Sequence, residues 1–176
     1  MNAQPVTCNL ANLLVRAATR GDLPALEWGS ELKHFRRLFA DAYDRSTKGE
    51  AFIWIAELLD FGLIGQLIVS FTSSRPELAD GSTRAYIYGV RVRTEYRNQG
   101  VGTHLMLTTE ADLSQRGFRY ATLNVGRQNP DAQRLYERLG YLIVGAEPGH
   151  WSYLDENGIR RNVYEPAWRM EKRLKD

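Results

Sequence analysis

A loop with two glycines, placed between a predicted strand and a predicted helix, constrains this chain more than any other segment. The loop, Arg97-Asn98-Gln99-Gly100-Val101-Gly102, follows the apolar run at 85–92 and opens a helix expected over about 101–116. Glycine has no Cβ, so a polyanion can approach the backbone closely there. The first N–H groups of a helix lack partners within it, the helix dipole adds positive charge, and Arg97 adds a full charge. The loop therefore predicts a cradle for a pyrophosphate; the alternative is a tight turn that only lets the helix pack on the strand.

A second segment, residues 129–141, has the features of a capped helix. Asn129 suits the N-cap, and Pro130 suits the first helical position, where its missing N–H costs nothing. Gly140 tolerates the left-handed backbone that ends many helices. The apolar side chains recur at i, i+3, i+4 and i+7, namely Ala132, Leu135, Tyr136 and Leu139. On this pattern alone Asn129 is an ordinary cap and Tyr136 an ordinary core residue.

The other segments predict strands mixed with helices. Strands are expected at 13–18, 52–59, 63–71, 86–92, 118–125 and 141–145, and the pair at 52–71 has the pattern of an antiparallel hairpin. Further helices are expected from Pro24 and over about 30–44, where apolar residues recur at helical spacing. The Ser-, Pro- and Gly-rich segment 72–83 predicts a loop.

The C-terminal part predicts a long hairpin. Asp155-Glu156-Asn157-Gly158 is a strong turn signal, because Asn-Gly supplies the positive φ values that tight hairpin turns need. Pro148 and Pro166 then fall nearly opposite each other, and neither can donate to a strand ladder. We expect a bend there that splits the hairpin into two arms. The outer arm, 149–165, covers a pocket, pairs two subunits or is a solvated hairpin whose aromatic side chains pack together, and we favour pairing and hence a homodimer.

Size and composition indicate one soluble globular domain. The chain has 176 residues, of which 43% are hydrophobic, which suits a single domain. We expect this domain at 12–176, after a loose leader at 1–11. The single cysteine, Cys8, cannot form an internal disulfide, and the N-terminus lacks a signal-peptide pattern, which favours the cytoplasm. The apolar runs are too short for a membrane span. A net charge of +2 without a basic stripe argues against a nucleic-acid partner. The isolated His34, His104 and His150 give no support for a metal site.

Taken in order, with a strand between them, the two motifs resemble those of the GNAT superfamily of acyl-coenzyme A-dependent N-acyltransferases. That family has an Arg/Gln-x-x-Gly-x-Gly/Ala loop, then an Asn-x-x-Ala-x-x-x-Tyr helix that ends in Gly-Phe or Gly-Tyr. The chain departs from the pattern at Thr94, where proline is commoner. The resemblance covers about residues 13–145 and extends to a closing strand at 167–174. It implies one α+β (α/β) domain, with a mixed, mostly antiparallel twisted sheet of about seven strands, about four flanking helices and an extended C-terminal β-hairpin.

The resemblance also implies roles for particular residues. The cosubstrate would be acetyl-CoA, without a metal, and the acceptor an amine on a small molecule, peptide or protein. Tyr136 would give a proton to the departing thiolate, which is feasible because a phenol has a pKa of about 10 and a thiol of about 8.5. The backbone N–H of Val92 would stabilise the oxyanion. The residues expected to hold the cosubstrate are Val90, Arg91, Val92, Arg97, Asn98, Gln99, Gly100, Val101, Gly102, Thr103, Asn129 and Tyr136.

The general base is the least determined part of this prediction. Some relatives carry a carboxylate on the central strand, but Tyr86, Tyr88 and Val90 supply none here. Glu57 on the neighbouring strand is the candidate, with an outward-facing surface carboxylate as the alternative; Tyr88 or Asn124 could instead order a water. Two other functions stay open: a catalytically silent acyl-CoA-binding module used for sensing, and a structural protein whose glycine loop holds another phosphate.

Overall fold

The computed structural model describes residues 8–175 and contains a seven-stranded sheet with the order β1-β2-β3-β4-β5-β9-β6, together with a separate β7-β8 hairpin. Its neighbours are antiparallel except β4 and β5. The strands are β1 (Leu13–Ala17), β2 (Ala51–Leu58), β3 (Gly62–Ser70), β4 (Arg84–Val92), β5 (Tyr120–Gly126), β6 (Leu142–Glu147), β7 (His150–Leu154), β8 (Arg160–Tyr164) and β9 (Ala167–Arg173). The helices are α1 (Leu23–Leu26), α2 (Arg36–Thr47), α3 (Val101–Gln115) and α4 (Pro130–Arg138). The predicted mixed, mostly antiparallel α+β fold is confirmed.

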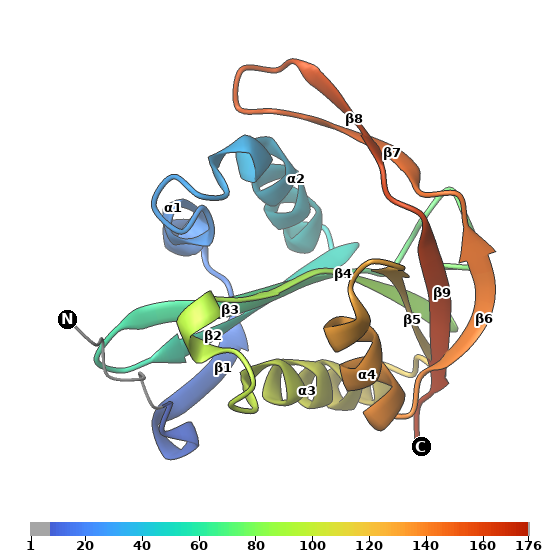
Figure 1. Cartoon of the computed structure of the whole chain (residues 1–176), viewed down its shortest axis with the longest axis horizontal. Coiled ribbons are helices and arrows are strands. Elements are labelled where there is room, and N and C mark those ends of the chain that lie inside the picture. Colours follow the sequence, from blue (N-terminus) through green and yellow to red (C-terminus); the bar gives the residue numbers. More distant parts are fainter. Residues whose placement is uncertain (1–7, 176) are drawn as a thin grey trace.

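The sheet is covered on both faces, α1 and α2 lying on one side and α3 and α4 on the other (Figure 1). This follows from strand alternation, which turns successive side chains to opposite faces. On β2, Ile53 and Ile55 join the hydrophobic cluster of α1 and α2. Phe52 and Trp54 face the cluster that holds the buried side of α3. The sheet is thus packed against a hydrophobic cluster on each face, which gives the neighbouring strands β3 and β4 a rigid support.

Two segments differ from their predicted bounds. The helix expected over about 30–44 begins at Arg36 and runs to Thr47, because residues 33–35 form a 3₁₀ turn after Trp28 and Gly29, both at positive φ. At the N-terminus, Cys8 is the one buried residue of the described part of the predicted leader, and Asn9, Leu10 and Ala11 are exposed. The Cys8 N–H donates to Gln99 Oε1 at 2.6 Å. The leader residues 1–7 lie outside the described part of the chain.

The C-terminal hairpin divides at the two prolines, as predicted. Pairing of β6 with β9 ends at Glu147 and Ala167, and pairing of β7 with β8 starts at His150 and Tyr164. The outer arm then curves over the N-terminal end of α2 (Figure 1). The Tyr153 ring lies 4.9 Å from the Phe35 ring just before α2, so this arm packs on its own chain. Pairing of two subunits stays a prediction.

Candidate active site

The site is built where the two central parallel strands separate. β4 pairs with β5 only from Arg84 and Tyr120 to Ile87 and Leu123, although both strands continue for several residues. A bulge explains the separation: Gly89 and Val90 of β4 stand against the single residue Leu67 of β3. Gly89 has a φ of +62°, and a bulge of this kind bends its strand and increases the local twist. Beyond the bulge, the edges of β4 and β5 that face each other are thereby left unpaired, while their other edges stay paired with β3 and β9.

Strand alternation determines which β4 groups face this open edge. The Arg93 N–H donates to the Ile64 carbonyl of β3 at 2.8 Å. Arg91, two residues earlier, directs its backbone toward β3 as well, so Val90 and Val92 direct theirs toward the open edge. The Val92 carbonyl accepts a hydrogen bond from Arg97 Nε at 2.9 Å. Within the predicted run Val90 to Val92, the outer two residues thus have backbone groups available for an extended ligand.

The N-terminus of α3 lies directly after the glycine loop and has free donors. Gly100 is its N-cap, and no side chain caps this end. The N–H groups of Val101, Gly102 and Thr103 find no acceptor among residues 8–175. Arg97 and Asn98 are exposed beside them. Three free N–H groups, a helix dipole and an arginine make this end suited to a phosphate.

Glycine is required at the two positions of the loop for different physical reasons. Gly100 has a φ of +88°, which any side chain would make unfavourable. A Cβ at Gly102 would lie 3.3 Å from Leu135 Cδ2 of α4. The tight-packing interpretation therefore holds for Gly102, while Gly100 is needed for the turn of the backbone that exposes the N–H groups.

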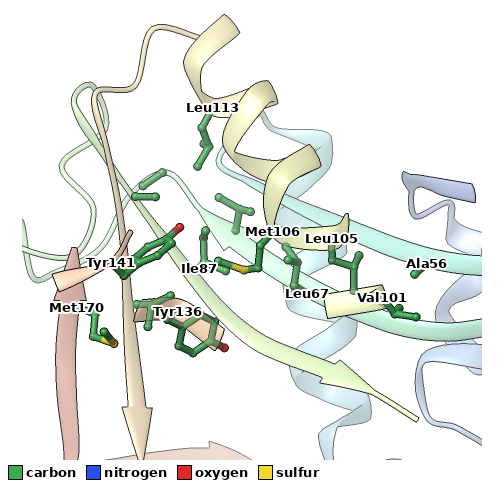
Figure 2. Packing of buried hydrophobic residues seen from close by; sticks show 14 of the residues in the cluster. Ala56, Leu67, Ile87, Val101, Leu105, Met106, Leu113, Tyr136, Tyr141 and Met170 are labelled. Carbon is green, nitrogen blue, oxygen red and sulfur yellow. The ribbon is translucent and has the colours of Figure 1, made fainter. Parts of the chain in front are cut away.

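Helix α4 brings Asn129 and Tyr136 to the same region. Asn129 Oδ1 accepts the Ala132 N–H at 3.2 Å, which confirms its interpretation as a helix cap. Tyr136 is 6% exposed and packs edge-on against Tyr141 (Figure 2). Its hydroxyl has no hydrogen-bond partner in the described chain but, unlike that of Tyr141, is not completely buried. Burial raises the pKa of Tyr136 to about 12, so the phenol keeps its proton at neutral pH.

Glu57 lies away from this group. Its carboxylate accepts a hydrogen bond from Arg16 Nε at 2.9 Å, and the same guanidinium binds Asp22. The structure thus places Glu57 in an ion-pair network between β1, β2 and the turn before α1. Because Arg16 engages its carboxylate, Glu57 is not a free base in this arrangement, and its base role stays a prediction.

The face of the sheet opposite α4 carries polar groups on β4 and β5. Asn124 Nδ2 donates to the Tyr86 hydroxyl at 3.5 Å, and Asn124 Oδ1 is buried without a partner. Tyr86 and Tyr88 stack with their ring centroids 5.4 Å apart. Burial raises the pKa of Tyr88 to about 12. An adjoining cavity of about 580 Å³ is lined by Arg45, Glu50, Ser70, Thr72, Ser73, Ser74, Tyr86 and Tyr88.

Sequence reasoning did not identify Arg45 or Gln66 as residues of this face. Arg45 comes from α2 and donates to Ser70 Oγ at 2.9 Å, a contact that no local pattern predicts. Gln66 is 1% exposed on β3. A glutamine within the apolar run of β3 was an available signal, because a buried amide needs hydrogen-bond partners.

Residues 8–175 contain no group of three or more His, Cys, Asp or Glu that could hold a metal ion. In the same range, no helix combines the length and the apolar character that a membrane crossing requires.

Comparisons with known proteins agree with this geometry. Among solved structures, the chain is similar to Ard1 from Thermoplasma volcanium, with a TM-score of 0.71, 17% identity, and coverage of 94% of this chain and 99% of that one. It is also similar to spermidine/spermine N-acetyltransferase SpeG from Vibrio cholerae in complex with manganese ions (TM-score 0.68, 19% identity, 93% of each chain). A third similar structure is a GCN5-related N-acetyltransferase from Kribbella flavida (TM-score 0.66, 22% identity, 94% of this chain and 100% of that one). The TM-scores show that these proteins share the fold of this chain, and at such low identities the comparison shows the fold alone.

A comparison with curated protein sequences gives no match. The sequence model of the acetyltransferase (GNAT) family matches residues 17–141, which is more than half of the chain and includes both motifs. The open edge between β4 and β5, the free N–H groups of α3 and the capped helix of Tyr136 all lie within this range. The chain therefore belongs to the GNAT family of acetyltransferases.

Proposed function

We propose that this protein transfers an acetyl group from acetyl-CoA directly to a primary amine. The strand edge left open beyond Ile87 and Leu123 carries the proposal, and the chain adds a helix N-terminus with free donors and a tyrosine that keeps its proton at neutral pH. An extended acyl thioester is complementary to these features: its pyrophosphate would bind at the helix N-terminus, its arm along the strand edge and its sulfur beside Tyr136. The family to which the chain belongs supports the same cosubstrate.

The binding roles follow from the available groups. The N–H groups of Val101, Gly102 and Thr103, with Arg97, Asn98, Gln99 and Gly100 around them, would hold the pyrophosphate. The backbone of Val90 and Val92 would bind the pantetheine arm in the manner of an added strand. Arg91 would contribute to this run only through its place in the strand, because its backbone faces β3. Asn129 would contact the arm through Nδ2, since its Oδ1 already caps α4.

The chemistry requires a neutral amine, a stabilised oxyanion and a proton for the thiolate. The Val92 N–H faces the open edge and would donate to the carbonyl oxygen as negative charge develops there. Tyr136 would give its proton to the departing sulfur, because a phenol with a pKa of about 12 is protonated at neutral pH. The unpartnered Asn124 Oδ1 would hold a water that receives the proton of the amine. Glu57 would serve as base only if its contact with Arg16 were broken.

The test is an assay of acetyl-CoA-dependent thiol release with polyamines, aminoglycosides, amino acids and peptides, combined with direct measurement of acetyl-CoA binding. We expect acetyl-CoA to bind and at least one amine class to be acetylated. Equal displacement of acetyl-CoA by ATP or NAD would contradict the proposed cosubstrate. Tight acetyl-CoA binding with no transfer to any amine would favour the silent acyl-CoA-binding module instead. A cytoplasmic location and a homodimer remain part of the proposal, tested by fractionation and by sedimentation.

A further inference from the structure

Arg91 is a half-buried cation that forms no ion pair within residues 8–175. It lies on β4, and its guanidinium folds back over the bulge so that Nη1 reaches the Gly89 carbonyl at 3.5 Å, a long contact. No carboxylate of residues 8–175 forms an ion pair with it; Glu165 acts on it only through its field. Burial lowers the pKa of the Arg91 guanidinium, which nevertheless stays charged at neutral pH. A guanidinium that has lost part of its hydration and has no counterion is an anion-binding group.

The neighbouring side chain adds another donor rather than an acceptor. Gln66 stands opposite Arg91 in the β3–β4 register, on the same face of the sheet. Its Oε1 accepts the Trp28 Nε1–H at 3.2 Å, which orients the amide and leaves Nε2 buried without a partner. Within residues 8–175, the Arg91 guanidinium and Gln66 Nε2 are thus two neighbouring donor groups that no side-chain acceptor satisfies.

Other arginines on this side of the sheet are satisfied by the protein. Arg45 donates to Ser70 and to Thr72 and lies 3.7 Å from Glu50. Arg93 donates to the Leu63 carbonyl at 3.0 Å and lies over the Trp28 ring. Arg91 differs because its remaining N–H groups face neither a carboxylate nor a short carbonyl contact.

Aromatic rings lie next to the Arg91 guanidinium. The Phe35 ring centroid lies 4.7 Å from the guanidinium carbon, and Trp151 and Tyr153 of the outer hairpin arm have ring contacts with Phe35. The guanidinium also lies beside Gly89, the residue at which the edge of β4 opens. A ligand that reaches Arg91 therefore lies close to the β4 bulge and to these rings.

We propose that Arg91 binds a carboxylate of the acceptor, so that the amine acetylated by this protein belongs to a small amino acid-like molecule rather than to a polyamine. A carboxylate matches a guanidinium in charge and can accept two parallel hydrogen bonds from it. A polyamine would instead bring a second cation next to Arg91, which is unfavourable in a partly buried site. This inference rests on the proposed acetyl transfer.

The experiment compares each of the standard amino acids with its amide in the thiol-release assay, since the amide keeps the amine and removes the negative charge. For the preferred amino acid, we expect kcat/KM to exceed that of its amide by about 10- to 100-fold, the range for a charge-assisted hydrogen-bond pair. In Arg91→Gln the ratio should fall to about one through loss on the acid alone. Arg173→Gln removes an exposed arginine at the end of β9 and should leave the ratio unchanged.

A second readout separates this inference from the proposed function. Thermal shifts with the same amino acids report binding without turnover, and acetyl-CoA binding is measured in parallel for wild type and Arg91→Gln. Acetylation of amides or polyamines as efficient as that of amino acids would overturn the carboxylate site while leaving acetyl transfer intact. The absence of any Arg91-dependent shift with amino acids would overturn it as well. Failure of acetyl-CoA to bind would instead contradict the proposed function.

Discussion

The two sides of the site are constructed differently. The proposed donor side consists of three continuous stretches, 90–92, 97–103 and 129–136, and relies mainly on backbone N–H groups at one helix end and one strand edge. The proposed acceptor side brings together side chains from separate elements, among them Phe35, Arg91 and Tyr153. Backbone donors are independent of most side-chain substitutions, whereas side-chain contacts are not. The donor side is therefore the part shared by a family, and the acceptor side is the part that distinguishes one member from another.

The two sides also differ in what holds them in place. The donor side rests on β4 and α3, whose inner residues Ile87, Leu105 and Met106 are at most 1% exposed. The outer hairpin arm is a separate two-stranded ladder, and such a ladder is only marginally stable by itself. It depends on ring contacts with Phe35 and His34. We infer that the acceptor side opens more easily, as small-molecule entry requires.

Removing the Tyr136 hydroxyl should have the largest effect, and only on the chemical step. We expect Tyr136→Phe to bind acetyl-CoA as wild type does and to lose about 10²- to 10⁴-fold in kcat, the usual contribution of a general acid. Tyr141→Phe is the matched control, because it removes the buried hydroxyl of the adjacent ring, which is next to Glu110 and has no role in the proposed chemistry. Equal kcat values for Tyr136→Phe and wild type would contradict the role of Tyr136 as the proton donor.

Gly100→Ala should weaken the donor side alone, through the backbone. The φ of +88° becomes strained by about 1 kcal/mol, and relief of that strain moves the free N–H groups of α3. We expect a roughly tenfold weaker binding of acetyl-CoA by calorimetry, with the KM for the amine unchanged.

Gly117→Ala is the control for this strain, because Gly117 follows the other end of α3 with a φ of +89° and open space around it. Both variants should lose similar stability in urea unfolding. If Gly117→Ala weakens acetyl-CoA binding as much as Gly100→Ala does, the effect is general destabilisation and not loss of the cradle.

Tyr153→Ala should weaken the acceptor side alone. The ring packs against Phe35, which in turn lies next to Arg91, so its removal loosens these aromatic contacts. We expect a several-fold rise in the KM for the amine and no change in acetyl-CoA binding, consistent with about 1 kcal/mol for an aromatic pair. Tyr164→Ala, on the exposed side of the hairpin, should change neither quantity. A loss of acetyl-CoA binding in Tyr153→Ala would show that the two sides are not independent.

The smallest effect concerns stability and should spare both sides of the site. Hydrogen bonds from Arg16, together with those from Thr19, hold the pKa of Asp22 well below its usual range. A depressed pKa in the folded state contributes stability that is present above the unfolded pKa of about 4 and is lost as the pH falls. We expect Asp22→Asn to lower the free energy of unfolding at pH 7 by about 1 kcal/mol and the difference from wild type to shrink below pH 4. Urea unfolding at both pH values measures this; a constant difference would contradict the ionic origin.

Local patterns predicted most of the donor side. The spacing of Asn129, Pro130 and Gly140 set the bounds of α4 almost to the residue, because caps and helix ends depend on near neighbours in sequence. The two prolines correctly divided the C-terminal hairpin for the same reason. Where the outcome depended on distant contacts, prediction was poorer. The burial of Cys8 against Gln99 and the pairing of Glu57 with Arg16 both join segments far apart in the chain.

By itself, the sequence determined the order of the elements, the helix N-terminus that follows the glycine loop, and the family, because each depends on patterns within short segments. Only the tertiary structure decided which β4 groups face the open edge, that Gly102 serves packing with α4, and that Arg91 forms no ion pair within residues 8–175. Those properties depend on what lies across a strand pair or on another element. The lack of an ion pair at Arg91, in particular, depends on every described element around it, and no local pattern predicts it.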